Sequence, residues 1–309
     1  MGQSAMMFEK IGAKRALVTG ASGYIGGALV SRLVGSGWQV SVIGRLSQRF
    51  GNYSKKNPDL QCYALEEDFQ NLEGIVRDSN PTVVFHVASK IKADTSEASL
   101  TSLIRANITF GSNLLAAMTK NRTPFFLNVG SYWEHYNNEE FNPVDLYAAS
   151  KRSFACMLDY FTEAFGIRAT TLELYDVYGP NDSRGKIIDT LLVAAKNDLK
   201  VEMSPGHQLM NFVHVSDVID GFMIVANGML SNSVFALDRY ALRAGNSYSL
   251  REVKEVIEEV SGKKINIEWG SFDYKDRTVM FPPDKVKVLD SWEPKISLEV
   301  GLRDIYRRL

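Results

Sequence analysis

A glycine-rich turn near the start of the chain constrains the fold more than any other feature. Residues 19–26 carry glycine at positions 20, 23 and 26, and Ile25, Leu29 and Leu33 follow with the spacing of one helix face. Glycines let the backbone approach a phosphate closely, and a helix N-terminus offers N–H groups and partial positive charge. The pattern predicts a strand–turn–helix unit that binds a dinucleotide; the alternative is a turn that is merely rich in glycine. The expected cofactor-binding residues of this turn are Gly20, Ser22, Gly23, Tyr24, Ile25 and Gly26.

Short apolar runs recur along the first part of the chain, with helical patterns between them. Such runs are typical of a parallel sheet that is buried on both faces. They occupy residues 16–18, 40–43, 82–85, 124–127 and 170–172, with a late addition at 234–237. The sequence therefore predicts an α/β fold built on a Rossmann-type, doubly wound parallel sheet.

The regular alternation of apolar runs and helical patterns ends after residues 178–180. The rest of the sequence predicts a smaller C-terminal α/β lobe that binds substrate. Ser249 and Glu252 form a capping box ahead of an apolar helical pattern, and Gly262 is placed to end that helix. Residues 212–218 are strand-like, so we expect the chain to return to the first lobe there. The expected division is a dinucleotide-binding domain at 1–180 with a return segment at about 212–240, and a substrate-binding lobe at 181–211 and 241–309.

Composition narrows the class of protein. The 35 basic and 36 acidic residues nearly balance, which argues against nucleic-acid binding. The two cysteines and four histidines show no metal-ligand spacing, so we expect no metal. No long apolar run follows the N-terminus, so we expect no membrane contact and a cytoplasmic location.

Arg45 bears on the choice of cofactor. An NAD-binding chain would place an acidic residue at the end of the second strand, yet no acid occurs between Val40 and Asn57. A guanidinium there suits the extra 2′-phosphate of NADP. We therefore expect NADP(H), with NAD(H) less favoured; the alternative is that Arg45 is an ordinary surface residue.

Three polar residues form a candidate catalytic set. Tyr147 and Lys151 lie four residues apart, on one face of a helix that is expected to begin after Pro143. A neighbouring ammonium lowers the pKa of a phenol towards neutrality, where proton transfer is most effective. Ser131 follows an apolar run and so lies at the carboxyl edge of the sheet, where open α/β folds bind ligands. The alternative for the pair is an exposed helix face without chemistry.

Taken together, these segments resemble the extended short-chain dehydrogenases/reductases that act on nucleotide sugars, the NAD-dependent epimerase/dehydratase family. The resemblance covers nearly the whole chain and rests on residues 19–26, 85–88, 106–107, 111–115, 147–151, 177–180, 212–218 and 292–294. It implies that Ser131 and Tyr147 contact the reacting sugar oxygen and that Lys151 holds the nicotinamide ribose. It also implies cofactor contacts at Ala88 and Asn107, with His86 lining the cleft; the alternative for Asn107 and His86 is that of core polar groups.

The resemblance also bears on the reaction. Dehydratases of the family carry an Asp-Glu pair after the catalytic Ser or Thr, whereas this chain has Tyr132-Trp133. The segment from Ser131 to Tyr147 is most similar to the nucleotide-sugar 4-ketoreductases, among them CDP-abequose synthases and dTDP-fucose-forming reductases. We therefore expect NADPH-dependent reduction of a 4-keto-6-deoxyhexose carried on a nucleoside diphosphate, dTDP or CDP. The alternatives are a nucleotide-sugar 4-epimerase and a non-catalytic NADP-binding regulatory protein.

Several positions depart from the family pattern and leave the substrate contacts open. Asp176 stands where many members have asparagine, Glu173 where they often have arginine, and Met210 where an arginine often meets the diphosphate. The expected substrate-binding residues are Ser89, Tyr132, Asp176, Arg184, Lys186, Lys275 and Arg277. For the four cations, the alternative is a solvated surface. The family also implies a homodimer packed through the helix of Tyr147.

Overall fold

The computed structural model describes residues 14–91, 94–231 and 238–309, and the chain groups into two compact units. The first unit comprises the described residues of Met1–Ser131, Leu146–Glu173 and Gly221–Tyr240. The second comprises Tyr132–Asp145, Leu174–Asp220 and the described residues of Ala241–Leu309. The assignment of residues 1–180 and 212–240 to the cofactor, and of 181–211 and 241–309 to the substrate, stays a prediction.

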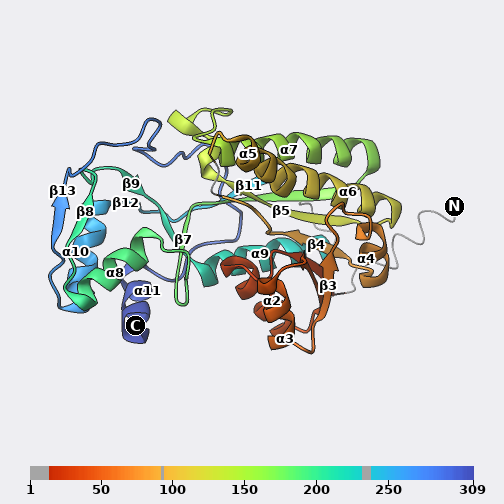
Figure 1. Ribbon diagram of the computed structural model, residues 1–309, viewed down its shortest axis with the longest axis horizontal. Coiled ribbons are helices and arrows are strands. Elements are labelled where there is room, and N and C mark those ends of the chain that lie inside the picture. The colour runs from red at the N-terminus through yellow and green to blue at the C-terminus, as the bar shows by residue number, and fades with distance from the viewer. Residues whose placement is uncertain (1–13, 92–93, 232–237) are drawn as a thin grey trace. The chain divides into compact units, whose positions relative to one another are not determined.

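A seven-stranded sheet with the order β11-β6-β5-β4-β1-β2-β3 forms the centre of the first unit (Figure 1). Its strands are β1 (Arg15–Thr19), β2 (Gln39–Arg45), β3 (Gln61–Leu65), β4 (Val83–His86), β5 (Phe125–Ser131), β6 (Arg168–Leu174) and β11 (Asp238–Leu242). The pairs β1–β2, β1–β4, β2–β3 and β4–β5 are parallel. Every residue of β4 and β5 is buried, as expected for strands covered on both faces. The predicted Rossmann-type α/β fold is confirmed.

Register brings the carboxyl ends of the central strands to one edge. Thr19 of β1 pairs with Ile43 of β2 and with His86 of β4. His86 in turn pairs with Asn128 of β5, three residues before that strand ends at Ser131. The glycine turn, the segment after β4 and Ser131 therefore all leave the sheet at the same edge.

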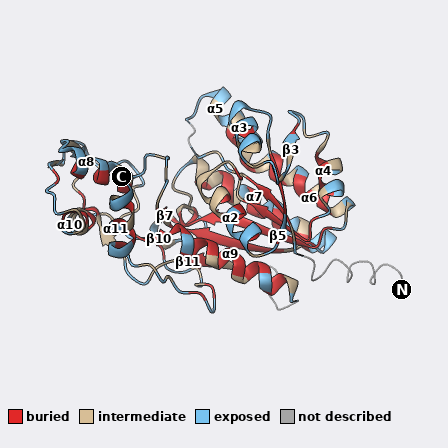
Figure 2. Cartoon of the chain, turned by 90° about the horizontal axis from the view of Figure 1, so that it is seen from below, coloured by how far each residue is buried: buried red, intermediate tan, exposed pale blue. Residues whose placement is uncertain are grey.

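Helices cover both faces of this sheet, and the strands between them are the most buried part of the unit (Figures 1 and 2). They are α2 (Tyr24–Gly35), α3 (Gln48–Lys56), α4 (Leu72–Ser79), α5 (Glu97–Ile104), α6 (Phe110–Lys120), α7 (Leu146–Phe165) and α9 (Val215–Leu230). A single π-helical turn, η1 (Arg105–Thr109), separates α5 from α6. Phe126, Leu114 and Phe154 belong to one apolar cluster that joins β5, α6 and α7.

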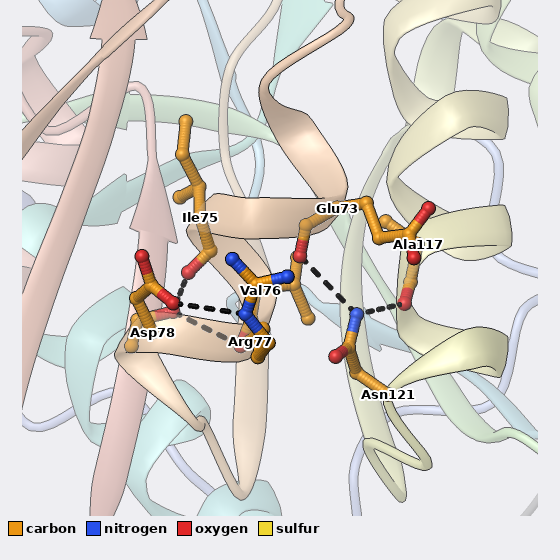
Figure 3. Close-up of polar contacts among 8 residues, drawn as sticks. Glu73, Ile75, Val76, Arg77, Asp78, Ala117 and Asn121 are labelled. Carbon is orange, nitrogen blue, oxygen red and sulfur yellow. Dashed lines mark hydrogen bonds and ion pairs between the residues drawn. The ribbon is translucent and has the colours of Figure 1, made fainter.

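Polar contacts fasten α4 to the end of α6 at the surface (Figure 3). The Asn121 amide donates to the Glu73 carbonyl at 3.3 Å and to the Ala117 carbonyl at 2.9 Å. The Lys120 ammonium lies 2.6 Å from the Glu73 carboxylate. Exposed pairs of this kind stabilise by at most about 1 kcal/mol each, so the buried cluster, not these contacts, holds the layer.

The second unit is a smaller α/β assembly with an apolar core of its own. Its helices are α8 (Ile187–Asn197), α10 (Leu250–Ser261) and α11 (Leu298–Arg308). Its paired strands are β7 (Asp176–Tyr178) with β10 (Phe212–His214), β9 (Leu209–Met210) with β12 (Tyr248–Ser249), and β8 (Val201–Met203) with β13 (Ile267–Trp269). The predicted capping box forms, because Ser249 accepts from the Glu252 amide and the Glu252 carboxylate accepts from the Ser249 amide. Gly262 ends α10 with a φ of +66°.

The sequence predicts strand-like segments at residues 212–218 and 234–237. Residues 212–218 are strand-like only to His214, because α9 begins at Val215, where the Ser216 amide donates to the His214 ring. The strand expected at 234–237 lies outside the described residues, and β11 begins at Asp238. No helix within the described ranges is long and apolar enough to cross a membrane.

Candidate active site

The glycine turn after β1 is packed so tightly that side chains are excluded. Gly20 has a φ of +75°, and a Cβ there would lie 2.7 Å from the Ala88 amide nitrogen. A Cβ on Gly26 would collide with the Gly20 carbonyl oxygen. Gly23 is the N-cap residue of α2, and it has no side chain to satisfy the first N–H groups of that helix. The turn thus has the form of a phosphate cradle at a helix N-terminus, which fits the pyrophosphate of a dinucleotide.

His86 lies under this edge as a core group. Its Nδ1 is 3.1 Å from the Thr19 hydroxyl oxygen, which also accepts from the Ala88 amide at 3.0 Å. The rings of Phe110, Phe126 and Phe154 surround the imidazole. Burial, reinforced by the charge of Lys151, lowers the pKa of His86 to about 3. A neutral, hydrogen-bonded histidine of this kind joins β1 to β4 and does no acid–base work near pH 7.

Two arginines lie at the end of β2 and in the helix that follows it. Arg45 ends β2 and is exposed. Arg49, on α3, donates from Nη2 to the carbonyl oxygen of Ser22 in the glycine turn at 2.7 Å. Arg49 is not among the predicted cofactor-binding residues, although its place four residues after Arg45 is a signal that could have identified it.

Lys151 connects the helix of Tyr147 to the strand that ends in Ser131. The buried Lys151 Nζ donates to the Val129 carbonyl at 2.9 Å and lies 5.9 Å from the centroid of the Tyr147 ring. Tyr147 sits in the first turn of α7, and Ser131 is the buried last residue of β5. The first unit therefore brings the hydroxyl-bearing strand end and the Tyr–Lys pair together through one carbonyl of β5.

Asn107 braces the same region from the π-helical turn. Its amide donates to the Lys90 carbonyl and to the Ser150 hydroxyl, both at 2.8 Å. Its amide oxygen accepts from the Lys90 amide at 2.7 Å and from the Ser89 hydroxyl at 3.2 Å. Ser150 donates in turn to the Tyr147 carbonyl at 2.7 Å. π-Helical turns often occur at functional sites, and this one holds the segment after β4 against the first turn of α7.

Tyr132, which is buried, and Asp176, which is partly buried, form a polar pair in the second unit. The Tyr132 hydroxyl donates to the Asp176 carboxylate at 3.1 Å, and its ring stacks on Tyr175 with centroids 4.8 Å apart. Burial raises the pKa of Asp176 to about 6, although the Tyr132 hydroxyl and the charge of Lys186 act in the opposite direction. Burial likewise raises the pKa of Tyr132 well above its ordinary value. The pair can hold or release a proton close to neutral pH.

The predicted cations of the second unit differ in what they contact. Arg184 forms a two-pronged ion pair with the buried Asp182, at 2.7 Å from Nε and 2.6 Å from Nη2. Arg277 lies 4.4 Å over the Tyr136 ring and donates to the Pro143 carbonyl at 2.8 Å, to the Val144 carbonyl at 3.3 Å and to the Asn142 side chain.

Lys186 is the N-cap residue of α8, and the side chain of Lys275 is exposed in a turn. Substrate binding by the four cations stays a prediction. No group of three or more His, Cys, Asp or Glu within the described residues could hold a metal ion.

A cavity in the first unit was not anticipated. It has a volume of about 580 Å³ and lies between the segment after β3 and the α5–η1 region, where the Arg105 guanidinium is 5.3 Å over the Phe69 ring. Its lining residues are Asp68, Phe69, Thr101, Ile104, Arg105, Thr109 and Asn113. The sequence did not indicate this cavity, because β3 was not among the predicted strands and the segment that follows it was therefore not placed at the sheet edge.

Comparison with known proteins gives a consistent family. The model of the NAD dependent epimerase/dehydratase family matches residues 16–236. A CDP-abequose synthase of Yersinia pseudotuberculosis is 27% identical over 284 residues, which is 88% of this chain and 96% of the relative. A UDP-glucuronate 4-epimerase of Thermodesulfobacterium geofontis is 24% identical and covers 93% of each chain. The crystal structure of the Thermus thermophilus UDP-glucose 4-epimerase in complex with NAD superposes with a TM-score of 0.78 at 22% identity, covering 95% of this chain and 99% of that one.

The chain belongs to the NAD dependent epimerase/dehydratase family. The expected resemblance to extended short-chain dehydrogenases/reductases is thereby confirmed, and with it the class of NAD(P)-dependent oxidoreductase acting on nucleotide sugars. The fold agrees with the solved epimerase structure. The roles of the individual site residues are proposals.

Proposed function

We propose that this chain reduces the C4 keto group of a nucleoside-diphosphate 4-keto-6-deoxyhexose, dTDP- or CDP-linked, with NADPH. Such a step serves deoxysugar and lipopolysaccharide O-antigen biosynthesis. The observation that carries the proposal is the Tyr147–Lys151 pair, fixed to β5 two residues before Ser131. Similarity to the CDP-abequose synthase over nearly the whole chain supports a CDP- or dTDP-linked deoxysugar as substrate.

The residues divide the work as follows. The Ser131 hydroxyl donates a hydrogen bond to the substrate carbonyl oxygen, and the Tyr147 hydroxyl delivers the proton that turns this oxygen into an alcohol. Lys151, held by the Val129 carbonyl, orients the nicotinamide ribose and keeps positive charge near the phenol. The reduced nicotinamide, when bound, supplies the hydride to C4. Tyr147 then regains its proton from solvent. Because hydride and proton pass directly to the substrate, the reaction needs no covalent intermediate.

Arg45 and Arg49 support NADPH as the reductant. Both guanidiniums belong to the segment where an NAD enzyme would place an acid, and Arg49 contacts the glycine turn itself. A planar fork of N–H donors matches a phosphate, so the 2′-phosphate of NADP is the expected partner. The structure of the Thermus thermophilus epimerase was solved in complex with NAD. NADH is therefore the alternative reductant that should be compared with NADPH.

A nucleotide-sugar 4-epimerase is the second candidate, favoured by the similarity to the UDP-glucuronate 4-epimerase. Tyr132-Trp133 disfavours a dehydratase, because elimination of water needs an acid and a base that these two side chains do not supply.

We also propose a homodimer through α5 and α7, which contact each other and expose apolar side chains. These are Leu100, Ile104, Met157, Tyr160 and Phe165.

Turnover with defined sugars tests the proposal. The protein is incubated with NADPH, or separately NADH, and dTDP-, CDP- or GDP-linked 4-keto-6-deoxyhexoses, and absorbance is followed at 340 nm. We expect NADPH consumption with one of these sugars and a loss of at least about 100-fold in kcat for Tyr147→Phe, since general acid catalysis contributes about 10²–10⁴. Ser153→Ala, an exposed position on the same helix, is the matched control. Inversion of a nucleotide sugar without net oxidation of NADPH would establish the epimerase, and cofactor binding without turnover a regulatory protein.

A further inference from the structure

Arg243 stands out among the arginines of the second unit. It directly follows β11 and is only partly exposed. Its Nε is buried and has no hydrogen-bond partner, and no ion pair of its guanidinium occurs within the described residues. Withdrawing part of a permanently charged guanidinium from water without a partner is costly. An anionic ligand is the natural complement.

Other arginines of this unit show what a satisfied guanidinium looks like here. Arg184 is neutralised by Asp182, and Arg277 is occupied by the carbonyls of Pro143 and Val144. Arg251 donates from Nε to the Pro205 carbonyl at 2.8 Å and lies 4.7 Å over the Trp269 ring. Each of these three has acceptors in its own chain, whereas the part of the chain that the structure describes offers no acceptor to the Nε of Arg243.

The backbone next to Arg243 is fixed. The buried side chain of Asn211 donates to the carbonyls of Ala244 at 2.9 Å and Asn246 at 3.0 Å, and it accepts from the Ala244 amide at 2.9 Å. The Asn211 carbonyl in turn accepts from the Asp176 amide at 2.9 Å. Through Asn211, the backbone that follows Arg243 is therefore tied to Asp176, the first residue of β7.

We propose that Arg243 binds the diphosphate of the nucleoside-diphosphate sugar. The identity of the ligand rests on the proposed function, whereas the need for an anion rests on the guanidinium itself. Its fork of N–H donors matches two phosphate oxygens, and the ligand compensates the charge that the free protein leaves without a partner. Arg243 is accordingly a binding residue for the substrate and takes no part in proton or hydride transfer.

The test measures binding of CDP, dTDP and UDP to the full chain by titration calorimetry, with NADPH present at saturation so that the cofactor site is filled. The variants are Arg243→Met, which keeps the length of the side chain, and Arg243→Lys. Arg303→Met is the matched control, because Arg303 is an exposed arginine of the same unit paired with Glu299. For Arg243→Met we expect nucleoside diphosphate binding to weaken 10- to 100-fold, or about 1.4–2.8 kcal/mol. The affinity of Arg243→Lys for the nucleoside diphosphate should lie between those of the wild type and Arg243→Met. The affinity of the control should equal that of the wild type.

Thermal unfolding separates a binding role from a structural one. Without ligand, Arg243→Met should melt at or above the wild-type Tm, because the change removes a charge that has no partner. A lower ligand-free Tm together with unchanged nucleotide affinity overturns the proposal. Wild-type binding of a nucleoside diphosphate that depends on Arg243, without turnover of any keto sugar, would refute the reductase and leave the assignment of Arg243 standing. Absence of nucleoside diphosphate binding by the wild type would refute both.

Discussion

The Asp176 carboxyl offers a quantitative test of the polar pair in the second unit. Its pKa is raised from 3.8 to about 6 in the folded chain, chiefly by burial. Between these two values the unfolded chain has lost the proton and the folded chain has kept it, so stability is fully present at low pH and is lost as the pH rises through about 6. Between pH 5 and pH 8 the loss integrates to about 1.4 kcal/mol, and partial solvent access reduces the expected effect to about 1 kcal/mol.

Asp176→Asn removes this titration and retains an oxygen that accepts from the Tyr132 hydroxyl. Relative to the wild type, the variant should therefore gain about 1 kcal/mol of unfolding free energy between pH 5 and pH 8. Urea unfolding followed by tryptophan fluorescence suits the measurement, because Trp133, Trp269 and Trp292 all lie in the second unit. Asp290→Asn, at an exposed carboxylate, should change stability equally at both pH values. The reasoning is refuted if the unfolding free energy of Asp176→Asn minus that of the wild type is the same at pH 5 and pH 8, or if it is smaller at pH 8.

Two further predictions concern the first unit. Gly26→Ala should weaken NADPH binding at least about 10-fold in a fluorescence titration, because the added Cβ collides with the Gly20 carbonyl and must open the turn; wild-type affinity would show that the turn does not hold the cofactor. The imidazole NMR signals of His86 should stay constant between pH 8 and pH 5, because burial lowers its pKa to about 3. Its stabilising contribution is present above the unfolded-state pKa of about 6.5 and declines as the pH falls below it, so a titration midpoint inside that window would contradict the neutral core assignment.

Most of the strands of the sheet could be predicted from short apolar runs in the sequence. The strands at Ala16–Val18 and Phe125–Leu127 could be predicted because strands buried on both faces must be apolar throughout. β3 was not predicted. It is the edge strand of the sheet, and although residues 62–65 of its sequence QCYAL are apolar, only Leu65 is buried. The helix at Val215 was missed because valines and a phenylalanine favour a strand locally, whereas the structure begins α9 there.

In the candidate site too, local spacing could be predicted from the sequence, whereas contacts between distant segments could not. Tyr147 and Lys151 could be identified because helical spacing makes them neighbours, and the end of β5 locates Ser131. Contacts between distant segments could not be foreseen. The sequence predicts Arg277 as a substrate-binding residue, but it gave no sign of the hydrogen bonds from Arg277 to the Pro143 and Val144 carbonyls, more than 130 positions earlier in the chain. The Nε of Arg243, which has no hydrogen-bond partner among the described residues, could likewise not be foreseen, because a missing partner can be recognised only when the surrounding segments are in place.

The division of the chain into units has a practical consequence for dissecting the gene. The polypeptide passes from one unit to the other five times, at positions 131–132, 145–146, 173–174, 220–221 and 240–241. No truncation therefore yields either unit as an uninterrupted fragment. An expression product that stops at residue 180 retains Asn142 and Pro143 without the Arg277 that binds them, and it loses residues 221–240 of the first unit. Fragment complementation, with breaks placed at these crossings, is the appropriate way to separate the two halves.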